Sequence, residues 1–171
     1  MSSASGPVPG AGSSPVSPEQ FAVWADFVLA HTHVMRAVET DLRRECGLSF
    51  TQYDVLYNLH AAPDGLTVSQ VGTALLYSSG SVTNLLNRME QLGLVHRTRA
   101  VHDRRVSRTT TSPDGEVLFA RATDVVLAAV AREFTRFLHD SEVAPVAAFL
   151  ARVRAQDQAL RQPPYDRPGS G

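Results

Sequence analysis

Apolar side chains recur every three or four residues between residues 18 and 46, and this spacing predicts one long α-helix. Ser17, Pro18 and Glu19 are typical of a helix N-terminus, and Gly47 is typical of a helix end. A helix of this length buries its apolar stripe only if much of the chain, or a second chain, covers it. The stripe consists of Phe21, Trp24, Val28, His31, Met35, Val38 and Leu42.

The pattern stays helical through the middle of the chain and then changes to the alternation of strands. Thr67 is in position to cap the second of three short helices, and Gly93 to end the third. The short helices are expected over Thr51–His60, Val68–Leu75 and Ser79–Leu92, and the strands over Leu94–Arg99 and Val106–Thr111. We therefore expect a mainly α-helical fold with a small β-hairpin, which is a helix-turn-helix followed by a wing.

Two further helices are predicted over Pro113–His139 and Glu142–Leu160, the second capped by Ser141. With residues 18–46 they carry more apolar surface than a small winged domain covers, which predicts a homodimer. The stripe of the first of them is Val117, Ala120, Asp124, Leu127, Val130 and Phe134. Residues 1–17 and 162–171 are rich in Ser, Gly and Pro, so we expect disordered tails around a folded domain of residues 18–161.

Composition narrows the classes of protein that fit. The net charge is −1, so any contact with a polyanion must come from a local patch. All basic residues are arginines, and a single cysteine excludes an intramolecular disulfide and a multi-cysteine zinc module. Uncharged stretches are too polar to span a membrane, so a cytoplasmic protein without membrane contact is expected.

The helix over residues 79–92 carries the first candidate site. No charged side chain occurs from Gly65 to Asn87, and small hydroxyl and amide groups on an exposed helix can approach base edges closely. Asparagine can pair with adenine through two hydrogen bonds. The alternative is that the serines and threonines only cap the helix. The candidate residues are Ser78, Ser79, Ser81, Thr83, Asn84, Asn87 and Arg88.

The hairpin carries the second candidate site. Residues 95–108 contain five arginines and one acid, a local charge of +4 in a chain of net charge −1. A basic hairpin beside a neutral helix suits contacts with phosphates and the minor groove of double-stranded DNA. A solvated hairpin without a ligand is the alternative. The candidate wing residues are Arg97, Arg99, Asp103, Arg104 and Arg105.

An ordered set of motifs over about residues 18–160 resembles the MarR (multiple antibiotic resistance regulator) family. The strongest are Gly93-Leu94-Val95-x-Arg97 followed by Asp103-Arg104-Arg105, with the run from Ser78 to Glu90 before them. The resemblance implies a winged helix-turn-helix homodimer that regulates transcription, as a repressor or an activator, at pseudo-palindromic operators. We take repression as the main hypothesis. It also implies a DNA-binding lobe over about 48–112 and dimerisation helices over 18–46, 113–139 and 142–160. Arg105 would enter the minor groove, oriented by an ion pair with Asp103.

A small aromatic ligand is the effector that this resemblance suggests. The pocket that would hold it lies between the first helix and the DNA-binding lobe. The alternative is that these aromatic residues belong to the core. The candidate pocket residues are Trp24, Phe27, His31, Tyr53 and Tyr57.

Other functions are kept as alternatives. Cys46 follows Arg43 and Arg44, which would favour its thiolate, so a thiol-based redox sensor is one of them. A winged helix that contacts only other proteins is a second. His31 and His33 are two positions apart on a helix, so they cannot easily share a metal ion, and we expect neither metal nor cofactor. No catalytic motif organises the serines, histidines and aspartates, so no enzymatic activity is expected.

Overall fold

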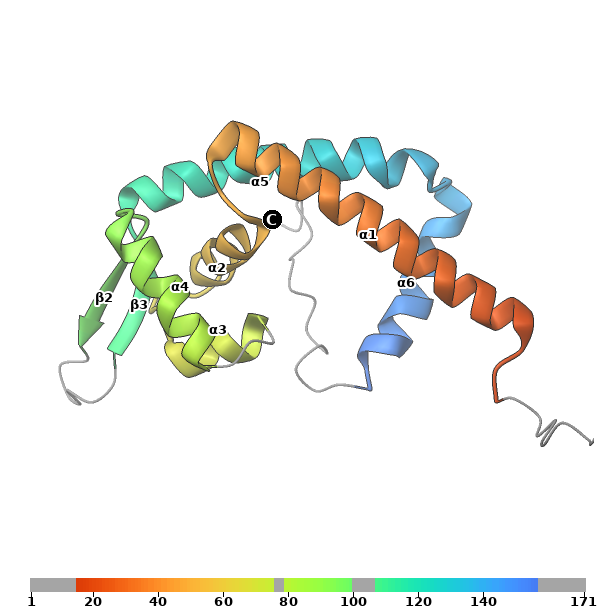
Figure 1. The fold of residues 1–171 in the computed structure, drawn as a ribbon, viewed down its shortest axis with the longest axis horizontal. Helices are drawn as coiled ribbons and strands as arrows, with labels where there is room; N and C mark the ends of the chain where they lie inside the picture. The colour runs from red at the N-terminus through yellow and green to blue at the C-terminus, as the bar shows by residue number, and fades with distance from the viewer. Residues whose placement is uncertain (1–14, 76–78, 100–106, 157–171) are drawn as a thin grey trace, which may run out of the picture. The chain divides into compact units, whose positions relative to one another are not determined.

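The structure is a computed structural model that describes residues 15–75, 79–99 and 107–156 (Figure 1). The predicted tails lie outside these residues, apart from residues 15–17. In chain order the elements are α1 (Pro18–Cys46), α2 (Phe50–His60), β1 (Leu66–Thr67), α3 (Val68–Leu75), α4 (Ser79–Gln91), β2 (Val95–Arg99), β3 (Ser107–Thr111), α5 (Pro113–Glu133), the 3-10 helix η1 (Thr135–Phe137) and α6 (Asp140–Arg154). This order confirms the predicted winged helix-turn-helix between long helices.

The chain divides into two compact units between His33 and Val34, within α1. In the N-terminal unit, Ser17 caps the helix by accepting a hydrogen bond from the backbone N–H of Gln20, as the sequence predicts. The aromatic residues of this unit contact one another along the helix, with 5.3 Å between the ring centroids of Phe21 and Trp24. Both side chains are more than half exposed, so this part of the predicted stripe is not buried within the chain.

The hydrophobic core lies in the second unit and is built around α2. Leu56 of α2 is fully buried together with Leu42 of α1, Val71 of α3 and Leu86 of α4. Ser49 begins α2 with a capping box, in which its side chain and that of Gln52 each accept a backbone N–H of the other. The cap therefore starts α2 at Phe50, one residue before the predicted start.

The start of α5 ties the last helices to the wing. The Ser112 hydroxyl accepts a hydrogen bond from the backbone N–H of Gly115 and donates one to the carbonyl oxygen of Gly93. A Cβ atom at position 115 would collide with the carbonyl oxygen of Leu94, so only glycine allows this approach. One serine and one glycine thus connect α5 to the segment that leaves α4.

The wing is a three-stranded antiparallel sheet with the order β1-β3-β2. The sequence predicts only two strands. The short strand β1 pairs Leu66 with Thr109 and Thr67 with Arg108, and two residues are too few to produce a visible alternation. Gly65 precedes it with φ of +77°, and a Cβ atom there would lie 2.7 Å from the carbonyl oxygen of Thr109. The predicted hairpin turn 100–105 lies outside the described residues.

The C-terminal helices differ from the prediction in their bounds. α5 ends at Glu133 rather than His139, because Phe134 leaves the helical conformation and the chain tightens into η1. α6 begins at Asp140, and its N-cap is His139 rather than Ser141. The backbone N–H of His139 donates to the Glu142 side chain, which fixes this earlier start. α6 is assigned to Arg154, and residues 157–160 of the predicted helix lie outside the described residues.

Most of the predicted stripe of α5 is exposed, and of its residues only Val130 is partly buried against the core. The buried residues of α5 include Phe119, Ala122 and Val126, whereas Val117 and Leu127 of the predicted stripe are 74% and 47% exposed. Both sets recur with helical spacing, so the period alone does not say which one faces the core. α5 therefore has two apolar faces, one packed within the chain and one exposed on it.

A buried carboxylate joins α1 to α5. Asp41 is 6% exposed, and its oxygens lie 2.8 Å from Nη2 of Arg132 and 2.7 Å from Nη2 of Arg44. The hydrogen bond from Arg132 is the main cause that holds the pKa of Asp41 below its usual value. The sequence pattern does not single out Asp41, because its partner Arg132 is 91 residues away along the chain.

Candidate functional site

Helices α3 and α4 form the predicted helix-turn-helix (Figure 1). Thr67 caps α3 as expected, because its hydroxyl accepts a hydrogen bond from the backbone N–H of Gln70. Val71 of α3 and Val82 of α4 are fully buried between the two helices and the rest of the core. Apolar packing on one side therefore fixes which side of α4 faces outward.

The outward side of α4 carries the predicted polar residues. Ser81, Asn84, Asn87 and Arg88 are exposed, and Thr83 is half-buried. Ser78 and the side chain of Ser79 lie outside the described part of the chain. On the inner side, Val82, Leu86 and Met89 are fully buried as predicted, whereas Leu85 is only partly buried. The structure thus brings the described candidate residues of α4 to one exposed surface.

Arg97 of the wing lies against α4. Its Nη1 donates a 2.7 Å hydrogen bond to Oδ1 of Asn87, and its Nη2 lies 3.4 Å from the carbonyl oxygen of Thr83. Its Nε lies 3.9 Å from Oε2 of Glu90. These contacts join β2 of the wing to α4. Contact of Arg97 with DNA stays a prediction.

Only some of the arginines of the wing belong to the part of the chain that the structure describes. Arg108 of β3 donates a 2.7 Å hydrogen bond from Nη1 to the carbonyl oxygen of Gly65, so it stabilises the fold beside β1. Arg99 lies at the end of β2, and its side chain is not described. The predicted wing residues Asp103, Arg104 and Arg105 lie outside the described residues. The local charge of +4 therefore includes two arginines, Arg97 and Arg108, that make contacts within the chain.

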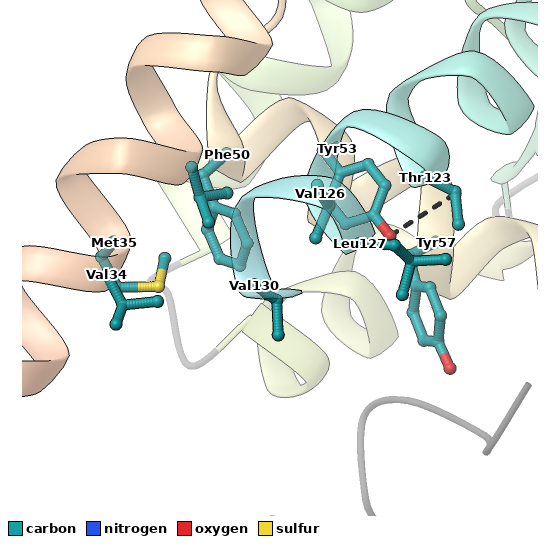
Figure 2. Close-up of a pocket in the computed structure, with 10 residues that line it drawn as sticks. Val34, Met35, Phe50, Tyr53, Tyr57, Thr123, Val126, Leu127 and Val130 are labelled. Atoms are coloured by element: carbon teal, nitrogen blue, oxygen red, sulfur yellow. Dashed lines mark hydrogen bonds between the residues drawn. The ribbon is translucent and has the colours of Figure 1, made fainter. Parts of the chain in front are cut away.

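A cavity of about 360 Å³ lies between α1, α2 and α5 (Figure 2). The predicted pocket residues Tyr53 and Tyr57 line it, and the hydroxyl oxygen of Tyr53 lies 3.5 Å from Oγ1 of Thr123. No charged side chain is present in this lining. The complete set is Val34, Met35, Val38, Phe50, Tyr53, Tyr57, Thr123, Val126, Leu127 and Val130.

The other three predicted pocket residues, Trp24, Phe27 and His31, do not line this cavity. They belong to the N-terminal unit, where Phe27 and His31 stack with their ring centroids 6.4 Å apart. The residues of α1 in the lining are Val34, Met35 and Val38. The sequence did not predict that residues of α5 line the cavity, because the apolar pattern of α5 does not show which helix it packs against.

Burial shifts the pKa of two side chains, those of Tyr53 and Cys46. It raises the pKa of the Tyr53 hydroxyl, which therefore stays protonated at neutral pH. It also raises the pKa of the Cys46 thiol, despite the nearby charge of Arg121. A raised pKa lowers the fraction of reactive thiolate, which disfavours the predicted redox alternative.

The described part of the chain contains neither a cluster of metal-ligating side chains nor a membrane-spanning helix. Within residues 15–75, 79–99 and 107–156, no three His, Cys, Asp or Glu side chains lie close enough together to hold a metal ion. The helices of these same segments include none that is both long and apolar enough to cross a membrane.

Comparisons with known proteins agree on this region. Residues 47–106 match the sequence model of the MarR family. A curated relative, the organic hydroperoxide resistance transcriptional regulator of Bacillus subtilis (strain 168), is 40% identical over 60 residues, which are 35% of this chain and 41% of the relative. The match thus spans about two fifths of the length of that protein.

Solved structures extend the similarity to most of the chain. AbsC, a MarR family transcriptional regulator from Streptomyces coelicolor, has a TM-score of 0.77 at 21% identity, over 84% of this chain and 97% of that chain. A second such regulator from the same organism, solved in complex with DNA, has a TM-score of 0.74 at 19% identity, over 81% of this chain and 90% of that chain. At these identities the likeness concerns the fold.

Proposed function

We propose that the chain is a transcriptional repressor of the MarR family, whose sequence model matches residues 47–106, and that it binds a pseudo-palindromic operator as a homodimer. The observation that carries this proposal is the exposed surface of α4, on which the polar, uncharged side chains of Ser81, Asn84 and Asn87 precede Arg88. Amide and hydroxyl groups can read base edges in the major groove, whereas a face that only met phosphates would be basic.

The wing supplies the second part of the proposed interface. By the resemblance to the family, Arg105 would enter the minor groove and Asp103 would orient it by an ion pair. An arginine there contributes affinity at every sequence, because it replaces counterions of the phosphates. The regulator of similar fold that was solved with DNA supports the same use of the fold here.

The homodimer follows from apolar surface that one copy leaves exposed. Leu127 of α5, Phe137 of η1 and Phe149 of α6 are 47%, 63% and 47% exposed. Large apolar side chains gathered on neighbouring elements mark an interface, and two-fold symmetric dimers are the commonest assemblies. A second copy of the chain is therefore the proposed occupant of these helices.

Asn84→Ala and Arg105→Ala are expected to weaken DNA binding in different ways. Asn84→Ala should cost about 1–3 kcal/mol at the operator and little on random DNA, because the amide reads bases. Arg105→Ala should weaken binding to both DNAs and reduce the salt slope by about one, because one cationic contact is lost. Gel shifts on the intergenic DNA upstream of its own gene and on random duplex, at two salt concentrations, measure both effects.

Equal proportional losses on both DNAs for the two variants would contradict this division of roles. Wild-type protein that binds neither DNA would contradict the proposed function and favour a winged helix that contacts other proteins. Thermal unfolding of each variant serves as the control, since Asn84 is exposed and its replacement should not change the melting temperature.

We also propose that a small, uncharged aromatic ligand in the cavity releases the protein from DNA. The volume of about 360 Å³ lies in the range of small-molecule sites, and the lining is apolar with hydroxyl groups from Tyr53, Tyr57 and Thr123. Since no cation lines the cavity, a carboxylate ligand would be buried without a partner.

Val130→Phe is expected to fill the cavity and abolish the response to such a ligand. Phenol and indole, tested separately, should raise the melting temperature of the wild type and weaken its DNA binding, because a ligand stabilises the state that it binds. The filled variant should lose both effects and keep DNA binding. Val117→Phe is the matched control, since Val117 is exposed and does not line the cavity. Unchanged responses in Val130→Phe would contradict the proposed site.

A further inference from the structure

We propose that Arg97 is a positioning residue that orients the side-chain amide of Asn87, so that Asn87 presents an N–H donor to the DNA. Asn87 would then select a base with a hydrogen-bond acceptor, and Asn84 alone would make the two-point contact with adenine. This inference rests on the proposed DNA-binding function of α4. It concerns which asparagine reads which kind of base.

The geometry begins with the contacts of Arg97 along α4. The guanidinium lies 2.7 Å from Oδ1 of Asn87, 3.4 Å from the carbonyl oxygen of Thr83 and 3.9 Å from Oε2 of Glu90. These three residues follow one another at spacings of four and three, so they share one side of the helix. The Arg97 side chain is 21% exposed, and its Nε is buried. Arg97 is thus packed into the join between wing and helix.

The chemistry of arginine fixes the amide of Asn87. A guanidinium has donors and no acceptor, so the amide must turn its oxygen toward Arg97. The Nδ2 group then points away from Arg97, on the exposed side of α4. Because Oδ1 of Asn87 is at the end of the amide that faces Arg97, its second lone pair is also on that side and not on the exposed side.

This orientation changes what Asn87 can read. The two-point contact with adenine needs an oxygen that accepts from N6 and a nitrogen that donates to N7. Asn87 offers only the donor outward, which suits guanine, thymine O4 or adenine N7 and disfavours cytosine, whose exposed group in the major groove is a donor. Asn84 is exposed, and within the described residues no hydrogen bond to another side chain orients its amide. Its oxygen and its nitrogen are therefore both available for the two-point contact with adenine.

Asn87→Asp tests the orientation directly. The new carboxylate keeps an oxygen toward Arg97 and places its second oxygen where the amide donated. We expect the preferred base at one position of each half-site to change toward cytosine, by about tenfold in relative affinity. The probe is a duplex library with a randomised core of about 30 base pairs, or three helical turns, from which the wild type and the variant each select sites.

Arg97→Ala tests the positioning role of the arginine. Base discrimination should fall by about tenfold at the same position of each half-site, while the salt slope stays unchanged because no phosphate contact is lost. Arg97→Lys should restore part of that discrimination, since an ammonium also donates to Oδ1. Arg88→Ala is the matched control for loss of an exposed arginine from this surface, and it should lower the salt slope without changing base preference.

The possible outcomes are distinct. An unchanged base preference in Asn87→Asp, or a salt slope lowered by about one in Arg97→Ala with unchanged preferences, overturns the inference. If Arg97→Ala fails to fold, Asn87→Asp still decides it, because that variant retains the arginine. A wild type that selects no sequence contradicts the proposed function itself, whereas a selective wild type with unaltered variants contradicts only the role of Arg97.

Discussion

Leu127→Asp is expected to convert the proposed homodimer into monomers at micromolar concentration. Leu127 is 47% exposed, on a face of α5 that the chain leaves partly uncovered. In the proposed dimer this face is covered by the second copy, so a carboxylate there would be buried without a partner, at a cost of several kcal/mol. Sedimentation of wild type and variant measures the change directly, and DNA binding should be lost with the dimer.

Two further variants separate the interface from other effects. Leu127 also lines the cavity, so Phe149→Asp on α6, which lies outside the cavity lining, should give the same monomer. Leu92→Asp is the matched control, because Leu92 is 57% exposed beside the end of α4 and outside the proposed interface. A wild type that sediments as a stable, folded monomer would contradict the proposed dimer, as would a dimeric Leu127→Asp.

Local signals in the sequence predicted most of the helices and the exposed polar side of α4. Thr67 caps α3, and the inward positions of α4 recur with a clear period that leaves Asn84 on the outside. Such features depend on residues three or four positions apart, which a sequence displays directly. The arginines of residues 95–108 likewise indicated a basic hairpin from composition alone.

Features that depend on distant residues were the ones missed. Strand β1 is two residues long and exists because Leu66 pairs with Thr109, 43 positions later. Arg97 was predicted as a wing cation, but its hydrogen bond to Asn87 depends on how β2 returns beside α4. The sequence did not indicate that Val34, Met35 and Val38 are the residues of α1 that line the cavity, since the same helical period also includes Trp24. The period of apolar residues predicts which side of a helix is apolar, whereas tertiary packing determines which element that side contacts.

Inserting about five base pairs at the dyad of the operator is expected to abolish dimer binding. Two α4 helices related by a two-fold axis must enter successive major grooves on one face of the duplex, with centres roughly 10 base pairs apart. Each wing then reaches outward to a flanking minor groove, where arginine inserts best if the groove is narrow, which favours A·T pairs. The operator should therefore be an inverted repeat of about 16–20 base pairs with A·T-rich ends.

The insertion turns one half-site by about half a helical turn, so the two recognition helices can no longer meet both half-sites from the same side. Footprinting of the wild type should show both half-sites protected on the native operator and neither on the extended one. An insertion of a full turn restores the common face but separates the half-sites by roughly 34 Å more, so it should restore binding only if the dimer can stretch. Protection of a single half-site, or binding that is indifferent to the five-pair insertion, would mean that the protein does not read DNA as a rigid two-fold dimer.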